Sequence, residues 1–184
     1  MTFSEGWHDQ YQRMLRSHQR LLEAAGPSSM GSAEARDRLY HFFQDAYHLK
    51  DWLKNDPTTR AQVTAHPKVE GLFNTPGQSV LCLQLCADLC NGVKHLGLTR
   101  DAKTGDKTTG FTRQDAYVTL GTIEIKAYVG GAPARSEPQP AHAGATGEHR
   151  WFVTSNGQTY DAVDLANEVV VEWEKWLTAQ QLLP

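Results

Sequence analysis

The sequence predicts an α+β protein, mainly α: an antiparallel four-helix bundle with a small antiparallel β-sheet inserted before the last helix. Two changes in hydrophobic period support this prediction. Apolar residues follow a helical period through most of residues 5–98, alternate from about residue 117, and return to the helical period after Asp161. Helices, a short sheet and a closing helix should therefore follow one another in that order.

Length and composition favour one domain. The chain has 184 residues, a formal net charge of -3 and 40% hydrophobic residues. A chain of this length can bury about 70% of its unfolded surface without help from a metal or disulfides. We expect a single domain over 1–184, with a helical core at 5–98, a β insert at 115–160 and a closing helix at 161–181.

Charge and apolar patterning exclude several classes of protein. The net charge of -3 and an isoelectric point near 6.2 argue against a protein held to nucleic acid mainly by a basic face. No apolar run is long enough for a membrane span, and the first residues lack the pattern of a signal peptide. Cys82, Cys86 and Cys90 lie four apart in one apolar segment and cannot all pair with one another. We expect reduced thiols and a cytoplasmic protein with no membrane partner.

The first half of the chain is predicted to be helical. An amphipathic helix runs from Glu5 to Ala25, and a second runs from about Ala33 to Lys54 with Ser32 as its cap. Asp56 and Pro57 suit the N-cap and first position of one or two short helical turns. The most apolar helix follows at 78–98 and should be the central, most buried element.

The second half is predicted to form the sheet and the last helix. Residues 99–115 are expected to be a loop, 117–129 a strand, and 130–148 a flexible loop rich in Gly, Pro and Ala. Further strands are expected at 149–154 and 158–160, on either side of an Asn-Gly turn. Asp161 should cap the closing helix, with Trp173 and Trp176 on its buried side.

Two polar lines mark the candidate site. The line on the central helix consists of Gln84, Asp88, Asn91 and His95. The line on the second helix consists of His41, Asp45, His48 and Trp52. Polar lines on otherwise apolar, neighbouring helices are most readily satisfied by each other, so we expect Asp88, Asn91 and His95 to meet the second line. The alternative is that each line is only the solvent edge of an amphipathic helix.

Metal ligation is one use of these residues. Asp45 and His48 place a carboxylate and an imidazole one helical turn apart. The full candidate ligand set between the helices is His41, Asp45, His48, Asp88 and His95. The pattern identifies no particular metal or cofactor.

Two segments, Tyr40 to Trp52 and Ala87 to Leu96, resemble the HEPN superfamily of helical bundles, especially bacterial members with an Asn-x-x-Lys-His ending. The resemblance covers mainly residues 5–98. It implies a metal-independent ribonuclease of a defence or toxin-antitoxin type that acts on RNA and often works as a homodimer. On this resemblance His95 is the catalytic histidine and Asn91 the polar residue, while Cys90 stands where the family motif has Arg.

Different classes of function therefore remain open. In a ribonuclease, His95 would act as general acid or base, Lys94 would stabilise phosphate charge, and Asn91 would position the phosphate. A non-catalytic module that binds a protein or a small ligand needs only the same fold and a satisfied polar interior. An open cleft at His95 would favour the nuclease, converging ligands a metal site, and a hydrogen-bonded cluster the non-catalytic module.

Overall fold

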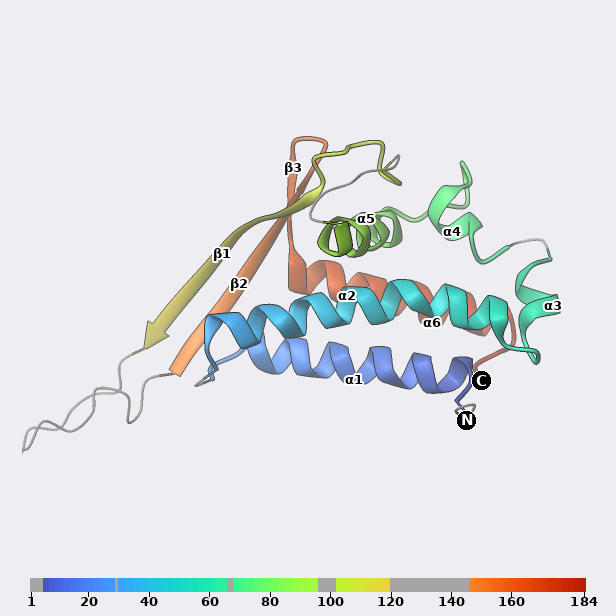
Figure 1. Cartoon of the computed structure of the whole chain (residues 1–184), viewed down its shortest axis with the longest axis horizontal. Coiled ribbons are helices and arrows are strands. Elements are labelled where there is room, and N and C mark those ends of the chain that lie inside the picture. Colours follow the sequence, from blue (N-terminus) through green and yellow to red (C-terminus); the bar gives the residue numbers. More distant parts are fainter. Residues whose placement is uncertain (1–4, 29, 66–67, 96–101, 120–145) are drawn as a thin grey trace, which may run out of the picture.

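The computed structural model describes residues 5–28, 30–65, 68–95, 102–119 and 146–184 (Figure 1). This part is mainly helical with a small antiparallel sheet, as the sequence predicts. Its long helices are α1 (Trp7–Ala25), α2 (Ser32–Asn55), α5 (Leu81–His95) and α6 (Ala162–Ala179). The short helices are α3 (Arg60–Val63) and α4 (Gly71–Asn74). The strands, in the spatial order β1-β2-β3, are β1 (Gly110–Thr119), β2 (Thr146–Ser155) and β3 (Gln158–Asp161).

The long helices surround one core. α1, α2 and α6 run along the long axis of the molecule, and α5 is seen foreshortened beside them (Figure 1). β1 and β2 form a long ribbon that leaves the helices at one end, while α3 and α4 lie at the other. Trp173 and Trp176 are buried, as predicted, and the indole N–H of Trp173 donates to the Ala46 carbonyl at 3.1 Å. This bond fixes α6 against α2.

The ends of the helices agree in part with the predicted caps. Asp161 caps α6, as predicted, because its carboxylate accepts from the Val163 N–H at 2.8 Å. The prediction that Ser32 caps the second helix is wrong, since Gly31 is the N-cap and Ser32 is already the first helical residue. The central helix is described only over Leu81–His95, and the remainder of its predicted end lies outside the described residues.

Asp56 caps a helix distant in sequence. Its carboxylate accepts from the Thr58 N–H at 2.8 Å, which forms the turn before α3. It also accepts from the Trp7 N–H at 2.9 Å and so caps the N-terminus of α1. The helix expected to begin at Pro57 instead begins at Arg60, and the segment contains two short helices, as the prolines led us to expect.

The sheet begins and resumes earlier than the sequence predicts. β1 starts at Gly110, inside the expected loop 99–115, and its Phe111 ring packs 5.8 Å from the Phe43 ring. β2 starts at Thr146, inside the expected loop 130–148. Strand pairing, which the local composition does not encode, decides both limits. Residues 120–145, which include most of the predicted strand 117–129 and of that loop, lie outside the described residues.

The hairpin between β2 and β3 is the one predicted. Asn156 and Gly157 have φ values of 49° and 73°, as the two central positions of a type I′ turn require. The register pairs Ser155 with Gln158 across the turn.

Candidate functional site

The Asp88 carboxylate binds the loop that leads into the sheet. It is only 1% exposed. It accepts from the Lys103 N–H at 2.7 Å, from the Thr104 N–H at 2.9 Å and from the Thr104 hydroxyl at 2.7 Å. The prediction that Asp88 meets the second helix is therefore wrong, because its carboxylate is bound to donors of the loop before β1.

The hydroxyls beyond Thr104 extend this network into the sheet. Thr104 Oγ1 lies 3.1 Å from Thr109 Oγ1, which in turn lies 2.7 Å from Ser155 Oγ. Thr109 and Ser155 are both buried. This series of hydrogen bonds thus links Asp88 on α5 to Ser155 at the end of β2, and Asp88, Thr109 and Ser155 in it are shielded from water.

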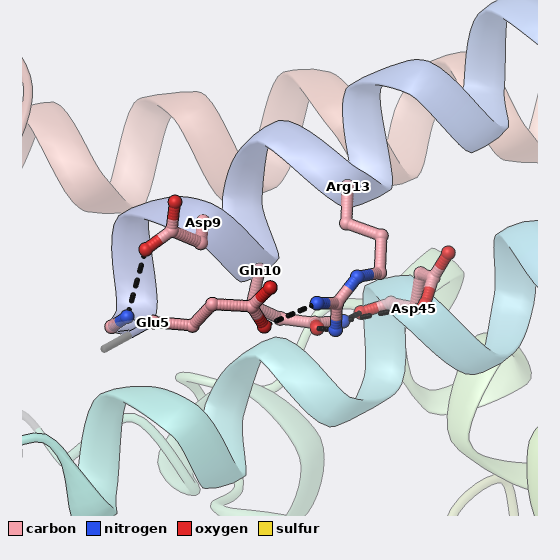
Figure 2. Close-up of polar contacts among 6 residues, drawn as sticks. Glu5, Asp9, Gln10, Arg13 and Asp45 are labelled. Atoms are coloured by element: carbon pink, nitrogen blue, oxygen red, sulfur yellow. Dashed lines mark hydrogen bonds and ion pairs between the residues drawn. The ribbon is translucent and has the colours of Figure 1, made fainter. Parts of the chain in front are cut away.

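Asp45 faces α1 and not α5. Its carboxylate accepts from the Ser17 hydroxyl at 2.5 Å, and its backbone carbonyl accepts from the Gln10 side-chain amide at 2.9 Å. Figure 2 shows the network continuing from Gln10 to the Arg13 guanidinium at 2.6 Å and from Arg13 to Glu5 at 2.7 Å. The Asp45 carboxylate is thus bound to side chains of α1, and among the described residues no hydrogen bond joins it to Asp88.

The other members of the second helix's line are not drawn together. His41 and His48 are exposed, and Trp52 is half-buried with the Arg13 guanidinium carbon 5.4 Å from its ring centroid. Within the ranges that the structure describes, no three His, Cys, Asp or Glu side chains are grouped so as to hold a metal ion. Since Asp45 and Asp88 are bound elsewhere, the predicted ligand set does not assemble around them.

The predicted nuclease residues lie at the end of α5. Asn91 is half-buried and Lys94 is exposed, while the side chain of His95 lies outside the described residues. Cys90, at the position of the motif arginine, is buried, and burial raises the pKa of its thiol to about 11 even though Lys94 and Lys50 lower it. A neutral thiol cannot supply the charge that the arginine would bring to a phosphate.

Sequence reasoning missed the partners of the two carboxylates. Gln10 and Ser17 lie on the buried side of α1, and two polar residues in an apolar stripe, each about one turn from Met14 and on either side of it, were the available signal. Thr104 and Thr109 lay in a stretch expected to be only a loop. His18 lies with its Nε2 2.8 Å from the Asn167 side-chain oxygen.

His149 and Trp151 form another buried polar pair that the sequence did not indicate. Their rings stack at 5.8 Å, and His149 Nε2 lies 3.1 Å from the Met30 carbonyl oxygen. His149 Nδ1 and Trp151 Nε1 have no hydrogen-bond partner among the residues described. Among the residues described, no carboxylate or hydroxyl is bonded to either ring, as a catalytic pair would need.

The described surface includes the following two clefts. One, of about 380 Å³, lies beside Trp52 and is lined by Glu5, Asp51 and Asp56 among others. Its carboxylates are already engaged, with Glu5 bound to Arg13 and Asp51 to Lys50, each at 2.7 Å.

The second cleft, of about 330 Å³, lies between the start of α5 and the middle of α6. Its principal lining residues are Val80, Leu81, Cys82, Glu168, Val171 and Glu172. We call it the α5–α6 groove.

Comparison with family models, with curated proteins and with solved structures found no match for this chain. Among the described residues, no helix is both long enough and apolar enough to cross a membrane. The function is therefore inferred from the geometry of the described residues.

Proposed function

We propose that this chain is a cytoplasmic, HEPN-like helical module that binds a protein partner without catalysing a reaction. The supporting observation is that two carboxylates, the buried Asp88 and the half-buried Asp45, are used internally. Asp88 receives three hydrogen bonds, and Asp45 receives one from Ser17 and one from Gln10. A carboxylate so occupied has little capacity left to move a proton or hold a metal, whereas it is well suited to holding a rigid scaffold.

Packing of the two resembling segments supports the HEPN-like part of the proposal. They lie on α2 and α5, and the Cys86 thiol on α5 contacts the Phe43 carbonyl oxygen on α2 at 3.4 Å. Side chains of α1, α2, α5 and α6 share one hydrophobic core. We infer an antiparallel four-helix bundle as the frame, with the sheet as an addition to one end.

A titration with two kinds of probe tests the proposed function. Amide spectra of the full chain are recorded with a panel of basic, acidic and neutral amphipathic peptides, and separately with single-stranded and hairpin RNA. We expect saturable shifts with at least one peptide class and intact RNA after incubation. The proposal would be overturned if the wild-type chain cleaved RNA, or if it bound none of the peptides.

RNA binding or cleavage at the end of α5 is the second candidate function. One observation favours it: Lys94 and Lys50 both lie close enough to Cys90 to lower the pKa of its thiol, with Lys94 exposed and Lys50 also paired with Asp51 at 2.7 Å. Two ammonium groups together suit a phosphate. In this candidate Asn91 positions the phosphate, His95 moves the proton, and a homodimer brings two such sites together.

Substitutions separate the second candidate from the first. His95→Ala should abolish cleavage with little loss of stability, and Lys94→Ala should weaken RNA binding. Lys175→Ala is the matched control, because Lys175 is exposed on α6 away from this end of α5. Equal RNA binding by all three variants and the wild type would remove the candidate, and sedimentation velocity would establish whether the active species is a dimer.

A further inference from the structure

The α5–α6 groove gathers the exposed apolar side chains of the described surface. Leu81 is 48% exposed and Val171 is 57% exposed, and within the described residues these are the large hydrophobic side chains left in water. Both line the same groove. Apolar residues scattered singly over a surface are ordinary, but two that share one concave site indicate a surface that something covers.

The rim of the groove is acidic. Glu168 and Glu172 lie one helical turn apart on α6, on either side of Val171. Like charges at this spacing repel each other and weaken the helix slightly. Glu172 is relieved in part by Lys175 at 3.4 Å, whereas Glu168 has no ion-pair partner among the residues that the structure describes.

The effect of this charge reaches the floor of the groove. Burial, together with the negative charges of Glu168 and Glu172, raises the pKa of the Cys82 thiol to about 12. The groove therefore combines an apolar centre with a negative potential.

We propose that the α5–α6 groove binds a basic amphipathic helix of a protein partner, with its apolar face on Leu81 and Val171 and its cations against Glu168 and Glu172. This inference rests on the proposed function and names its surface and the chemistry of its partner. Both walls of the groove are helices and neither is a sheet edge, so an added strand would find no ladder to extend. A helix laid into the groove needs only side-chain contacts.

Charge also argues against other occupants. In a twofold dimer through this groove, Glu168 and Glu172 of one copy would lie near the same residues of the other, and these like charges would repel. An RNA backbone would meet the same repulsion. A segment with lysines or arginines around an apolar stripe complements both properties of the groove.

The test uses the full chain and a designed peptide of about 15 residues, long enough to form a helix on binding. The peptide carries leucines at i, i+3, i+4 and i+7 and lysines elsewhere, and its control replaces every lysine with glutamate. Calorimetry and amide shifts report affinity and location. We expect the lysine peptide to bind at least about tenfold more tightly than the glutamate peptide, with shifts at 80–82 and 167–172 and with weakening by salt.

Three variants identify the surface. Val171→Asp should weaken binding of the lysine peptide, and Glu168→Lys should weaken it while improving binding of the glutamate peptide. Asp37→Lys is the matched charge control, because Asp37 is an exposed carboxylate of α2 outside the groove. Circular dichroism and thermal melts establish that all three remain folded.

Each outcome decides the matter. Tighter binding of the glutamate peptide, shifts confined to other residues, insensitivity to Val171→Asp, RNA bound at the groove, or self-association that Val171→Asp abolishes would each overturn this inference. Binding of an acidic or neutral peptide elsewhere would leave the proposed function standing. Failure of the whole peptide panel would overturn the proposed function as well.

Discussion

The Asp88 carboxylate accepts hydrogen bonds from both the backbone N–H and the hydroxyl of Thr104, at 2.9 and 2.7 Å. One residue of the loop thus offers two donors to one residue of α5, and Lys103 adds a third at 2.7 Å. The loop before β1 is therefore held to the helical core by a buried negative charge. Asp88 has a structural task that its place on a polar line did not suggest.

Asp88→Ala should destabilise the fold by about 2 to 3 kcal/mol, because the substitution leaves loop donors without their acceptor. Chemical denaturation measures the loss. Hydrogen exchange should accelerate at Lys103 and Thr104 in the variant. Asp37→Ala, at an exposed carboxylate, is the control and should change the unfolding free energy by less than about 0.5 kcal/mol. Equal stability of the two variants would contradict the role given to Asp88.

Ser17→Ala should lower the unfolding free energy by about 1 to 2 kcal/mol, because Ser17 is buried and donates to the Asp45 carboxylate at 2.5 Å. A double-mutant cycle with Asp45→Ala isolates the interaction, and we expect a coupling energy of about 1 kcal/mol. Additive effects of the two substitutions would show that they do not act on each other. Thr178→Ala, at an exposed position of α6, serves as the control for loss of a hydroxyl.

Trp173→Ala should cost about 3 to 5 kcal/mol, because Trp173 is 0% exposed in the core and its removal leaves a cavity. The substitution also removes the donor to the Ala46 carbonyl. Trp173→Phe, which fills most of the volume without the N–H, should cost less. An unchanged thermal midpoint in the alanine variant would contradict the placement of α6 against α2.

Unfolding should become easier above pH 10, in part through Tyr11. Burial, together with the charge of Glu174 and the hydrogen bond that Glu174 accepts from the hydroxyl at 3.1 Å, raises the pKa of that hydroxyl from 10.0 to about 12. Between these two pH values the unfolded chain loses the proton while the folded chain keeps it, so the unfolding free energy falls as pH rises. The stability that Tyr11 contributes is fully present below pH 10.

Tyr11→Phe isolates this contribution from other groups that titrate in the same range. The variant keeps the ring but has no hydroxyl to ionise, so its stability should fall less steeply above pH 10 than that of the wild type. Denaturation midpoints on both sides of this pH measure the difference. Parallel curves for the two proteins would contradict the raised pKa.

The elements were predictable because each depends on local pattern. The helical period of α1, α2 and α6, and the cap at Asp161, follow from side chains only a few positions apart. The start of β1 at Gly110 could not be found this way. Its polar residues become a strand because β2 pairs with them, with Phe111 opposite Val153.

For the candidate site, the sequence predicted only which polar residues share one face of each of two helices. A helical spacing places Asp45 on one side of α2, but it does not determine which neighbouring helix lies against that side. The hydrogen-bond partners of Asp45 are on α1 and those of Asp88 are in a loop. Tertiary packing decides which donors lie close enough to each carboxylate to bind it. The α5–α6 groove depends on how two distant helices meet, and no single segment encodes it.

The three cysteines of α5 can report when each part of that helix becomes exposed to solvent. Cys82, Cys86 and Cys90 are all buried free thiols, and burial is the largest cause that raises the pKa of each. The thiolate is the form that attacks an alkylating reagent, so at neutral pH each of these thiols should react only when its surroundings open. Mass-resolved labelling would time the exposure of one helix at three successive turns. A partner bound in the α5–α6 groove should lower the labelling rate of Cys82 more than that of Cys90.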